Sequence, residues 1–340
     1  MKALYLSAPQ SFEYREAGAP KAPQGWVRVR IRQVGICGSD IHYYATGRIS
    51  DQVVRYPFVL GHEGSGEILD GAGLFPAGAP VYIEPAISCH QCDQCLAGRE
   101  HTCRNIRFLG NPLEIPGCMC EEIALPPECV LALPDWTGLD EAVLLEPLSI
   151  AVHAAKHSNA AQGCRTAIVG AGPIGLSALL AVSEFGPRQI LVSEPVAARR
   201  AAALKLGAHS AFDPGPGAVS DAVVDASQGG VEVAFECCGT QESIDDATRM
   251  LRPGGTLVLI GIPEVDRITY DPHLARRREI TIVNVRRQNR CVEQALSILE
   301  RRRDAARVLL THRFPPRKAK EAFDLVQQKA DGVIKAVLEF

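Results

Sequence analysis

The stretch GAGPIG at residues 170–175 decides the fold of the second half of this chain. It directly follows an apolar run at 166–169 and opens an apolar segment at 174–185, so we expect a strand, a tight turn and a helix. Glycines in this G-x-G-x-x-G pattern permit the turn and let a pyrophosphate approach the helix N-terminus. The residues expected to bind a dinucleotide here are Gly170, Gly172, Pro173, Ile174 and Gly175.

Strand and helix patterns alternate beyond this turn. Further strands are expected at 190–193, 231–235, 257–260 and 280–285, with a helix at 197–206. This alternation predicts an α/β, Rossmann-type domain at 147–287 with a doubly wound parallel sheet. Helical periods near 292–299 and 319–326 and a closing strand at 333–338 then predict a return to the first domain.

Glu194 falls at the end of the second expected strand, where a carboxylate can bind the ribose hydroxyls of a dinucleotide. A carboxylate there would repel a 2′-phosphate, so NAD is expected rather than NADP. Arg199 and Arg200 follow closely and keep NADP open, and other α/β proteins bind different cofactors with similar loops.

The first 146 residues are rich in short β-type runs broken by Gly and Pro, which predicts a mostly β domain. A length of 340 residues with 46% hydrophobic content allows two domains. The net charge of −3 gives no large field of one sign, so neither nucleic acid nor a membrane surface is an expected partner. The basic runs at 276–278 and 301–303 are interpreted as solvated faces.

The chain has no apolar run long enough for a membrane span and no secretory signal, so a cytoplasmic protein is expected. Twelve cysteines in a chain of this kind indicate metal ligation rather than disulfides. Four of them, Cys89, Cys92, Cys95 and Cys103, follow the spacing C-x2-C-x2-C-x7-C. Four thiolates can close a tetrahedral zinc site with no open position, so this site should be structural. An iron–sulfur cluster and free surface thiols are the alternatives.

A second set of possible ligands lies in glycine-rich turns. Cys37 opens the segment CGSDIH, His62 and Glu63 stand in GHEG, and Glu146 lies at the expected domain boundary. Thiolate, imidazole and carboxylate are all zinc ligands, although each of these residues alone could have a structural role.

Taken in order along the chain, the phrases GICGSDIHYYATGRI, VLGHEGSGEI, the cysteine loop, EPLSIAVHA and FECCG resemble the zinc-containing medium-chain alcohol dehydrogenase family. Several match its sorbitol and polyol dehydrogenase branch best. The resemblance implies a GroES-like catalytic domain at 1–146, completed by 288–340, and an NAD-binding domain between them. It also implies one catalytic and one structural zinc ion per chain.

The resemblance assigns roles at the second metal site. Cys37 and His62 would bind zinc with Glu63 as third ligand, and Glu146 would be either a direct ligand or the partner of a zinc-bound water. Ser39 and His42 match the family's proton relay, although a turn-capping serine and a surface histidine are the alternative.

The resemblance further places Cys238, Gly239, Gly261, Val285 and Arg286 at the dinucleotide, together with Arg199. Tyr43, Arg286 and Arg287 are the candidates for substrate contact. Arg287 stands where the branch has an aromatic residue, so a second guanidinium could recognise a carboxylate or phosphate. A solvent-facing or cofactor-facing Arg287, and a core or interface role for Tyr43, are the alternatives.

The expected reaction is zinc- and NAD-dependent oxidation of a secondary alcohol of a polyol or polyol phosphate to the ketose, in a homodimer or homotetramer. A threonine-type or vicinal-diol dehydrogenase would use the same zinc and NAD. A catalytically idle NAD-binding protein is the alternative from another class.

Overall fold

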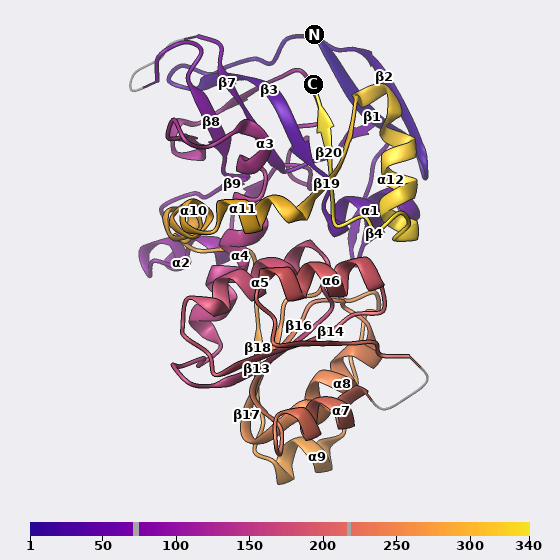
Figure 1. Cartoon of the computed structure of the whole chain (residues 1–340). Coiled ribbons are helices and arrows are strands. Elements are labelled where there is room, and N and C mark those ends of the chain that lie inside the picture. Colours follow the sequence, from indigo (N-terminus) through magenta and orange to yellow (C-terminus); the bar gives the residue numbers. More distant parts are fainter. Residues whose placement is uncertain (71–74, 216–218) are drawn as a thin grey trace. The chain divides into compact units, whose positions relative to one another are not determined.

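The computed structural model describes residues 1–70, 75–215 and 219–340, and its contacts divide the chain into two units (Figure 1). The first unit comprises residues 1–146 and 310–340, and the second comprises 147–309. Each unit has its own hydrophobic core.

The chain returns to the first unit at Leu310, whereas the sequence predicted this boundary at 288. Two helices account for this difference. Helix α10 (Val292–Arg301) packs against α5 (Pro173–Ser183), and α11 (Arg303–Ala306) packs against α6 (Ala197–Leu206). Their apolar faces therefore belong to the second unit.

The first unit is built around a seven-stranded sheet with the order β12-β8-β7-β3-β20-β19, in which β11 also pairs with β3. Its strands are β3 (Val27–Gly35), β7 (Glu63–Ile68), β8 (Pro80–Ile83), β11 (Glu122–Leu125), β12 (Val130–Ala132), β19 (Leu310–Phe314) and β20 (Lys335–Glu339).

Smaller sheets complete this unit: β1 (Lys2–Ala8) with β2 (Ser11–Glu16) and β6 (Phe58–Val59), β9 (Ala86–Ile87) with β10 (Arg107–Phe108), and β4 (Arg48–Ile49) with β5 (Gln52–Val53). Its helices are α1 (Gly38–Thr46), α2 (Asp93–Leu96), α3 (Leu139–Ala142) and α12 (Ala319–Gln328), with 3₁₀ turns η1 (Glu100–Thr102), η2 (Pro127–Cys129) and η4 (Pro316–Lys318).

The register at the end of β3 positions the later site. Gly35, the last residue of β3, pairs with Glu63 of β7 on one side and with Val337 of β20 on the other. The chain then enters α1 through Cys37, which is the N-cap residue. Segments from three distant parts of the sequence therefore meet where β3 ends.

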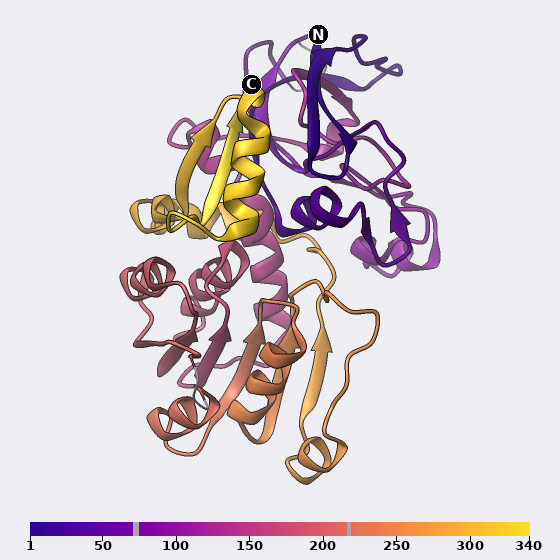
Figure 2. The same ribbon diagram turned by 90° about the vertical axis from the view of Figure 1, so that its right-hand side faces the viewer.

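The second unit contains a six-stranded parallel sheet with the order β15-β14-β13-β16-β17-β18. This is the strand order of a doubly wound sheet, the class that the sequence predicted. Figure 1 shows the sheet between α5 and α6 on one side and α7 and α8 on the other, and Figure 2 shows its strands side by side. The strands are β13 (Arg165–Val169), β14 (Gln189–Ser193), β15 (Ser210–Phe212), β16 (Val231–Glu236), β17 (Leu251–Leu259) and β18 (Thr281–Asn284).

The remaining helices of this unit are α4 (Leu145–His157), which begins at the boundary, α7 (Val219–Ala226), α8 (Gln241–Met250), α9 (Pro272–Arg277) and η3 (Arg307–Leu309). The predicted α/β class and the predicted strands of this sheet are confirmed, whereas the short strands β15 and β19 were not expected. Among the described residues, no helix combines the length and apolar character that crossing a membrane requires.

Candidate metal centres and dinucleotide site

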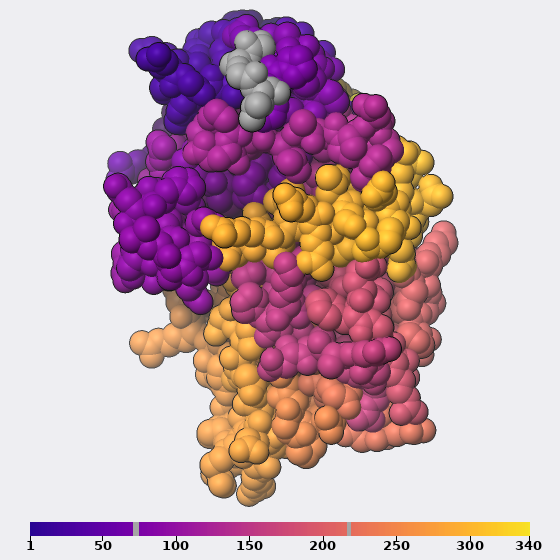
Figure 3. Space-filling model, turned by 90° about the vertical axis from the view of Figure 1, so that its left-hand side faces the viewer, coloured from indigo at the N-terminus to yellow at the C-terminus, as the bar shows by residue number. Residues whose placement is uncertain are grey.

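The four-cysteine loop brings its sulfur atoms together as expected, with the ligand atoms of Cys89, Cys92, Cys95 and Cys103 all within 4.8 Å of one another. The Sγ atom of Cys92 lies 3.6 Å from that of Cys95 and 3.9 Å from that of Cys103. The loop forms part of the purple projection at the left of Figure 3. Four converging sulfurs fit a closed, tetrahedral zinc site.

Local hydrogen bonds to the cysteine sulfur atoms favour the binding of a cation by this loop. The backbone N–H groups of Cys89 and Asn105 donate to the Cys103 sulfur at 3.3 and 3.4 Å. Backbone N–H groups, that of Gln91 first, lower the pKa of Cys89 to about 6, which favours the thiolate that zinc requires. Arg104 closes the loop by donating to both carboxylate oxygens of Asp93 at 2.5 and 2.8 Å.

The second set of ligands also converges. Side-chain ligand atoms of Cys37, His62 and Glu63 lie within 4.8 Å of one another, and His62 and Glu63 are buried. Cys37 follows β3, whereas His62 and Glu63 come from the start of β7, which the register of the sheet aligns with the end of β3. Burial and then the Glu63 carboxylate raise the pKa of Cys37 to about 12 in the absence of a metal ion.

Asp40 contacts this cluster through its side chain. This residue was not singled out in the sequence. Its fully buried carboxylate accepts hydrogen bonds from the backbone N–H groups of Cys37 at 3.0 Å and Gly61 at 3.2 Å. One of its oxygens also lies 3.7 Å from Nδ1 of His62. Asp40 thus fixes the turns that carry two of the candidate ligands, and its carboxylate lies close to the imidazole of His62.

Glu146 lies at the first turn of α4, and its Oε2 atom is buried without a hydrogen-bond partner. Burial raises the pKa of Glu146 well above its usual range, and Glu63, Cys37 and Glu84 raise it further while His62 opposes them. An unpartnered carboxylate oxygen beside other anionic groups is costly unless a cation neutralises it. The donor set therefore fits a divalent metal ion.

Lys335 is a second residue that the sequence analysis missed. Its side chain is 1% exposed, and its ammonium donates to both carboxylate oxygens of Glu63, at 2.6 and 2.7 Å, and to the carbonyl oxygen of Ile36 at 3.2 Å. Burial lowers the pKa of Lys335, but Glu63 and Cys37 outweigh this effect and leave it raised. The signal in the sequence was a lone charge within the apolar closing strand.

The candidate relay residues lie on one helix. Ser39 and His42 are three residues apart in α1, so their side chains share one face, and both are partly exposed. Burial raises the pKa of the Cys37 thiol and outweighs the Ser39 side chain, which lowers it. Tyr43 is buried, and its hydroxyl donates to Gln52 at 3.0 Å, so its ring is part of the core of this unit.

The glycine-rich loop of the second unit has the geometry expected of a dinucleotide site. Gly170 has a φ of +94°, and a side chain on Gly175 would lie 1.8 Å from the carbonyl oxygen of Gly170. Gly172 is the N-cap residue of α5, Pro173 is its first residue and Ile174 follows. The backbone therefore turns sharply and presents a helix N-terminus at the carboxyl end of β13.

Glu194 follows β14 and is buried beside this loop. Its two oxygens accept hydrogen bonds from the backbone N–H groups of Ala171 at 2.7 Å and Val196 at 2.9 Å. Each oxygen retains a second lone pair for a ribose hydroxyl. Arg199 is also buried, and one of its terminal nitrogens lies 3.7 Å from the position a Cβ atom would take on Gly172.

The other expected cofactor residues gather at the same edge of the sheet. Cys238 and Gly239 follow β16, and their backbone N–H groups donate to Glu236 at 2.6 and 2.7 Å. Gly261 follows β17, and a Cβ atom there would lie 2.3 Å from the backbone nitrogen of Gly239. This close packing at the carboxyl ends of parallel strands is where such folds bind ligands.

Val285, Arg286 and Arg287 follow β18. The backbone N–H of Val285 donates to Leu259 at 3.0 Å, Arg286 is exposed, and Arg287 is partly buried with a φ of +52°. The two arginines therefore differ in exposure and in backbone conformation. Among these three residues, only Arg287 has a left-handed backbone conformation.

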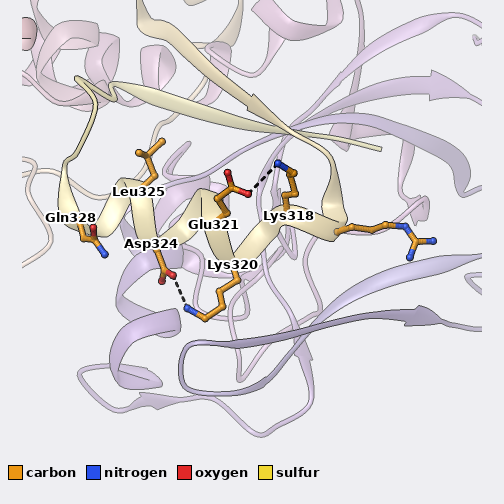
Figure 4. A pocket seen from close by; sticks show the side chains of 7 residues that line it. Lys318, Lys320, Glu321, Asp324, Leu325 and Gln328 are labelled. Carbon is orange, nitrogen blue, oxygen red and sulfur yellow. Dashed lines mark hydrogen bonds and ion pairs between the residues drawn. The ribbon is translucent and has the colours of Figure 1, made fainter.

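A separate concavity of about 550 Å³ runs along α12 in the first unit (Figure 4). Four of its charged side chains form ion pairs: Lys320 lies 2.6 Å from Asp324, and Lys318 lies 3.3 Å from Glu321. Because the concavity contains neither a candidate metal ligand nor a residue of the dinucleotide loop, it is not a candidate for the chemistry.

Comparisons with known proteins follow the same division of the chain. Residues 23–135 match the alcohol dehydrogenase GroES-like domain, and residues 173–301 match the zinc-binding dehydrogenase family. The chain is 30% identical to sorbitol dehydrogenase of Bacillus subtilis, with 99% of this chain and 97% of the relative covered. The chain belongs to the zinc-containing medium-chain alcohol dehydrogenase family, in its sorbitol and polyol branch.

Two further similar proteins are named as dehydrogenases of other substrates. L-idonate 5-dehydrogenase of Vitis vinifera is 33% identical, over 88% of this chain and 84% of the relative. The structure of 2R,3R-butanediol dehydrogenase from Bacillus subtilis superposes with a TM-score of 0.88 at 26% identity, covering 100% of this chain and 99% of that one. The chain is therefore an oxidoreductase that uses zinc and NAD and acts on small-molecule alcohols.

Proposed function

We propose that this dehydrogenase oxidises a secondary alcohol of a polyol to the ketose and transfers the hydride to NAD. The observation that carries the proposal is the convergence of Cys37, His62 and Glu63 beside the unpartnered, buried oxygen of Glu146. This set mixes a thiol, an imidazole and carboxylates, which is typical of a catalytic zinc site rather than of a closed structural one.

Cys37, His62 and Glu63 are the proposed protein ligands, and Glu146 either completes the set or accepts a hydrogen bond from a water at the open position. Zinc bound there supplies a Lewis acid that lowers the pKa of a substrate hydroxyl. Cys89, Cys92, Cys95 and Cys103 are proposed to hold the structural zinc, and they take no part in the reaction.

The proton released from the alcohol needs a path to solvent. Ser39 stands two residues after Cys37, and His42 lies one turn further along the same helix face; both are partly exposed. The Ser39 hydroxyl is therefore proposed to accept the proton near the metal centre and His42 to hand it to water, a duty that suits an imidazole near neutral pH.

The proposed dinucleotide site uses the residues at the carboxyl ends of β13, β14, β16, β17 and β18. Glu194 is proposed to bind the ribose hydroxyls and Arg199 to contact the dinucleotide above Gly172. This predicts that NAD is preferred over NADP. Replacing Glu194 with Ser should reduce the NAD:NADP preference, by roughly 10-fold for the loss of one charged partner.

A sugar acid is the second candidate substrate. Arg287 lies after β18 in a partly buried position, and a guanidinium can bind a carboxylate through two parallel hydrogen bonds. The grape relative is named for L-idonate, which is itself a sugar acid. A vicinal diol is an alternative substrate, because the butanediol dehydrogenase structure is similar to this chain. A threonine-type substrate is a further alternative, which would use the same zinc and NAD.

The chain is further proposed to act in the cytoplasm as a homodimer or homotetramer. All twelve cysteines, each of which lies among the described residues, are free of disulfides. This is the pattern of a protein from a reducing compartment.

The test is NADH formation with NAD and a panel of polyols, polyol phosphates, sugar acids, short diols and threonine, on protein of known zinc content. The proposal expects turnover of a polyol by the wild type and none by Cys37→Ser. Preference for a sugar acid that disappears in Arg287→Met, with polyol turnover kept, would favour the second candidate. Absence of turnover on every class, with two zinc ions bound, would contradict the proposal.

A further inference from the structure

The buried pair of Glu63 and Lys335 links the metal cluster to the C-terminal strand. β20 runs antiparallel to β3, with Val337 paired to Gly35 and the N–H of Ile36 donating to Ala336 at 2.9 Å. This register places Lys335, the first residue of β20, beside the point where the chain turns toward Cys37. Both side chains of the pair are 1% exposed.

Gly35 leaves the space that the pair occupies. A Cβ atom on Gly35 would lie 2.1 Å from Oε2 of Glu63, so any larger residue would collide with this carboxylate. The Glu63 side chain therefore crosses over Gly35 to reach Lys335 on the neighbouring strand. Three strands of the sheet, β7, β3 and β20, cooperate in this one contact.

The ammonium group of Lys335 is fully used. It has three protons, and its three acceptors are the two Glu63 oxygens and the carbonyl oxygen of Ile36. Glu63 is not saturated, because an ionised carboxylate offers about four lone-pair sites. Glu63 can thus contact a metal ion while Lys335 holds its orientation.

Lys335 also offsets part of the negative charge at this site. Cys37, Asp40, Glu63 and Glu146 are four acidic groups of one cluster, and Lys335 is paired with one of them, Glu63. A buried carboxylate without a partner is costly in a protein interior, so Lys335 stabilises the position of Glu63.

We propose that Lys335 is a positioning residue of the catalytic metal centre, which orients Glu63 across Gly35 toward the metal ion. The inference rests on the proposed function, because it concerns the same metal site. It predicts that the hydrogen bonds from Lys335 to Glu63, and not the packing of its side chain alone, control how tightly the catalytic metal is held.

The experiment compares the wild type with Lys335→Met, Lys335→Arg, Glu63→Gln and the double variant Lys335→Met/Glu63→Gln. Arg32→Met serves as the matched control, since it removes the ion pair with Glu67 on the same sheet at a partly exposed position. The readouts are zinc content after dialysis, the rate of zinc transfer to a chromophoric chelator, and the visible spectrum of the cobalt-substituted protein.

Lys335→Met should keep the structural zinc and bind the second zinc about 10- to 100-fold more weakly, as is usual when a partner of a metal ligand is removed. Lys335→Arg should stay near wild type, and Arg32→Met should match it. Because Lys335→Met leaves a buried carboxylate unpaired and can fail to fold, the double variant, which removes both charges, carries the test. If Lys335 acts through Glu63, the double variant should bind the second zinc about as well as Glu63→Gln alone, without a further loss of about 10-fold.

A structural ion pair without influence on the metal would give a different result. The melting temperature would fall in Lys335→Met while zinc release and the cobalt spectrum stayed as in the wild type, and this outcome would overturn the inference. A double variant that binds the second zinc at least about 10-fold more weakly than Glu63→Gln, or that fails to fold, would overturn it too, because Lys335 would then not act through Glu63. If the wild type itself binds only one zinc or turns over no alcohol, the proposed function fails first.

Discussion

The two candidate metal centres of the first unit are built in opposite ways. The four-cysteine loop takes all its ligands from residues 89–103, and its supporting hydrogen bonds come from the same segment. The other centre is formed by Cys37, His62 and Glu63, which come from separate segments of the chain. Glu146 and Lys335, from two further segments, contribute a buried carboxylate oxygen and an ion pair with Glu63. The local loop depends on spacing alone, whereas the assembled centre depends on the register of the sheet.

This contrast predicts that changes at the Cys37, His62 and Glu63 centre abolish turnover and leave the fold intact. Changes at the four-cysteine loop should destabilise the fold and leave turnover nearly unchanged. Four substitutions, taken from the largest expected effect on turnover to the smallest, test the comparison.

Cys37→Ser should reduce turnover by about 10³-fold or more, because a Lewis acid contributes several kcal/mol and each 1.4 kcal/mol is about tenfold in rate. Zinc content should fall from two ions per chain to one. Elemental analysis and steady-state NADH formation measure both quantities. Cys164→Ser, a buried cysteine of the second unit without ligand spacing, is the control and should keep two zinc ions and full turnover.

His42→Ala should slow turnover by about 10²-fold near neutral pH, the usual contribution of a positioned acid–base group. The loss should shrink as the pH rises, because hydroxide and buffer bases can then take the proton. A pH profile of kcat with external imidazole is the measurement. An unchanged profile would mean that His42 is only a helix surface residue.

Asp40→Asn keeps the shape of the side chain but removes the charge near His62 and at the turn of Cys37. Losing such a partner typically costs about 10- to 100-fold in metal affinity or activity. Competition for zinc with a chelator of known affinity measures the effect. Equal zinc affinity in the variant and the wild type would show that the Asp40 contacts serve the turns alone.

Cys103→Ser should change turnover at low temperature by less than about twofold, because the chemistry does not pass through the closed site. It should lose one zinc ion and lower the melting temperature by about 5 °C or more, since each 1 kcal/mol shifts the midpoint by about 2–4 °C in domains of this size. Calorimetry gives the midpoint. A loss of turnover as large as in Cys37→Ser would break the distinction between the two centres.

The sequence predicted the local features of this molecule best. The glycine-rich turn at 170–175, the strands of the parallel sheet and the four-cysteine loop each depend on short-range spacing, and the structure shows the expected geometry at all three. The candidate ligands of the second centre could be selected by residue type, although their convergence required the pairing of β3 with β7.

The missed features all depend on contacts between distant segments. Asp40 and Lys335 carry ordinary charged side chains, and only the fold shows that both are buried against the same cluster. The boundary at 288 was expected too early, because the helical period of 292–299 does not reveal which core its apolar face joins. No single-sequence pattern encodes such pairings.

The most direct test of the account is stepwise removal of zinc from the native enzyme with a chelator, while zinc release, NADH formation and circular dichroism are followed together. The first zinc ion released should take all of the turnover with it and leave the fold intact, and the second should leave more slowly with loss of structure. Turnover that survives loss of the first ion and falls only with the second would contradict the assignment of the two centres.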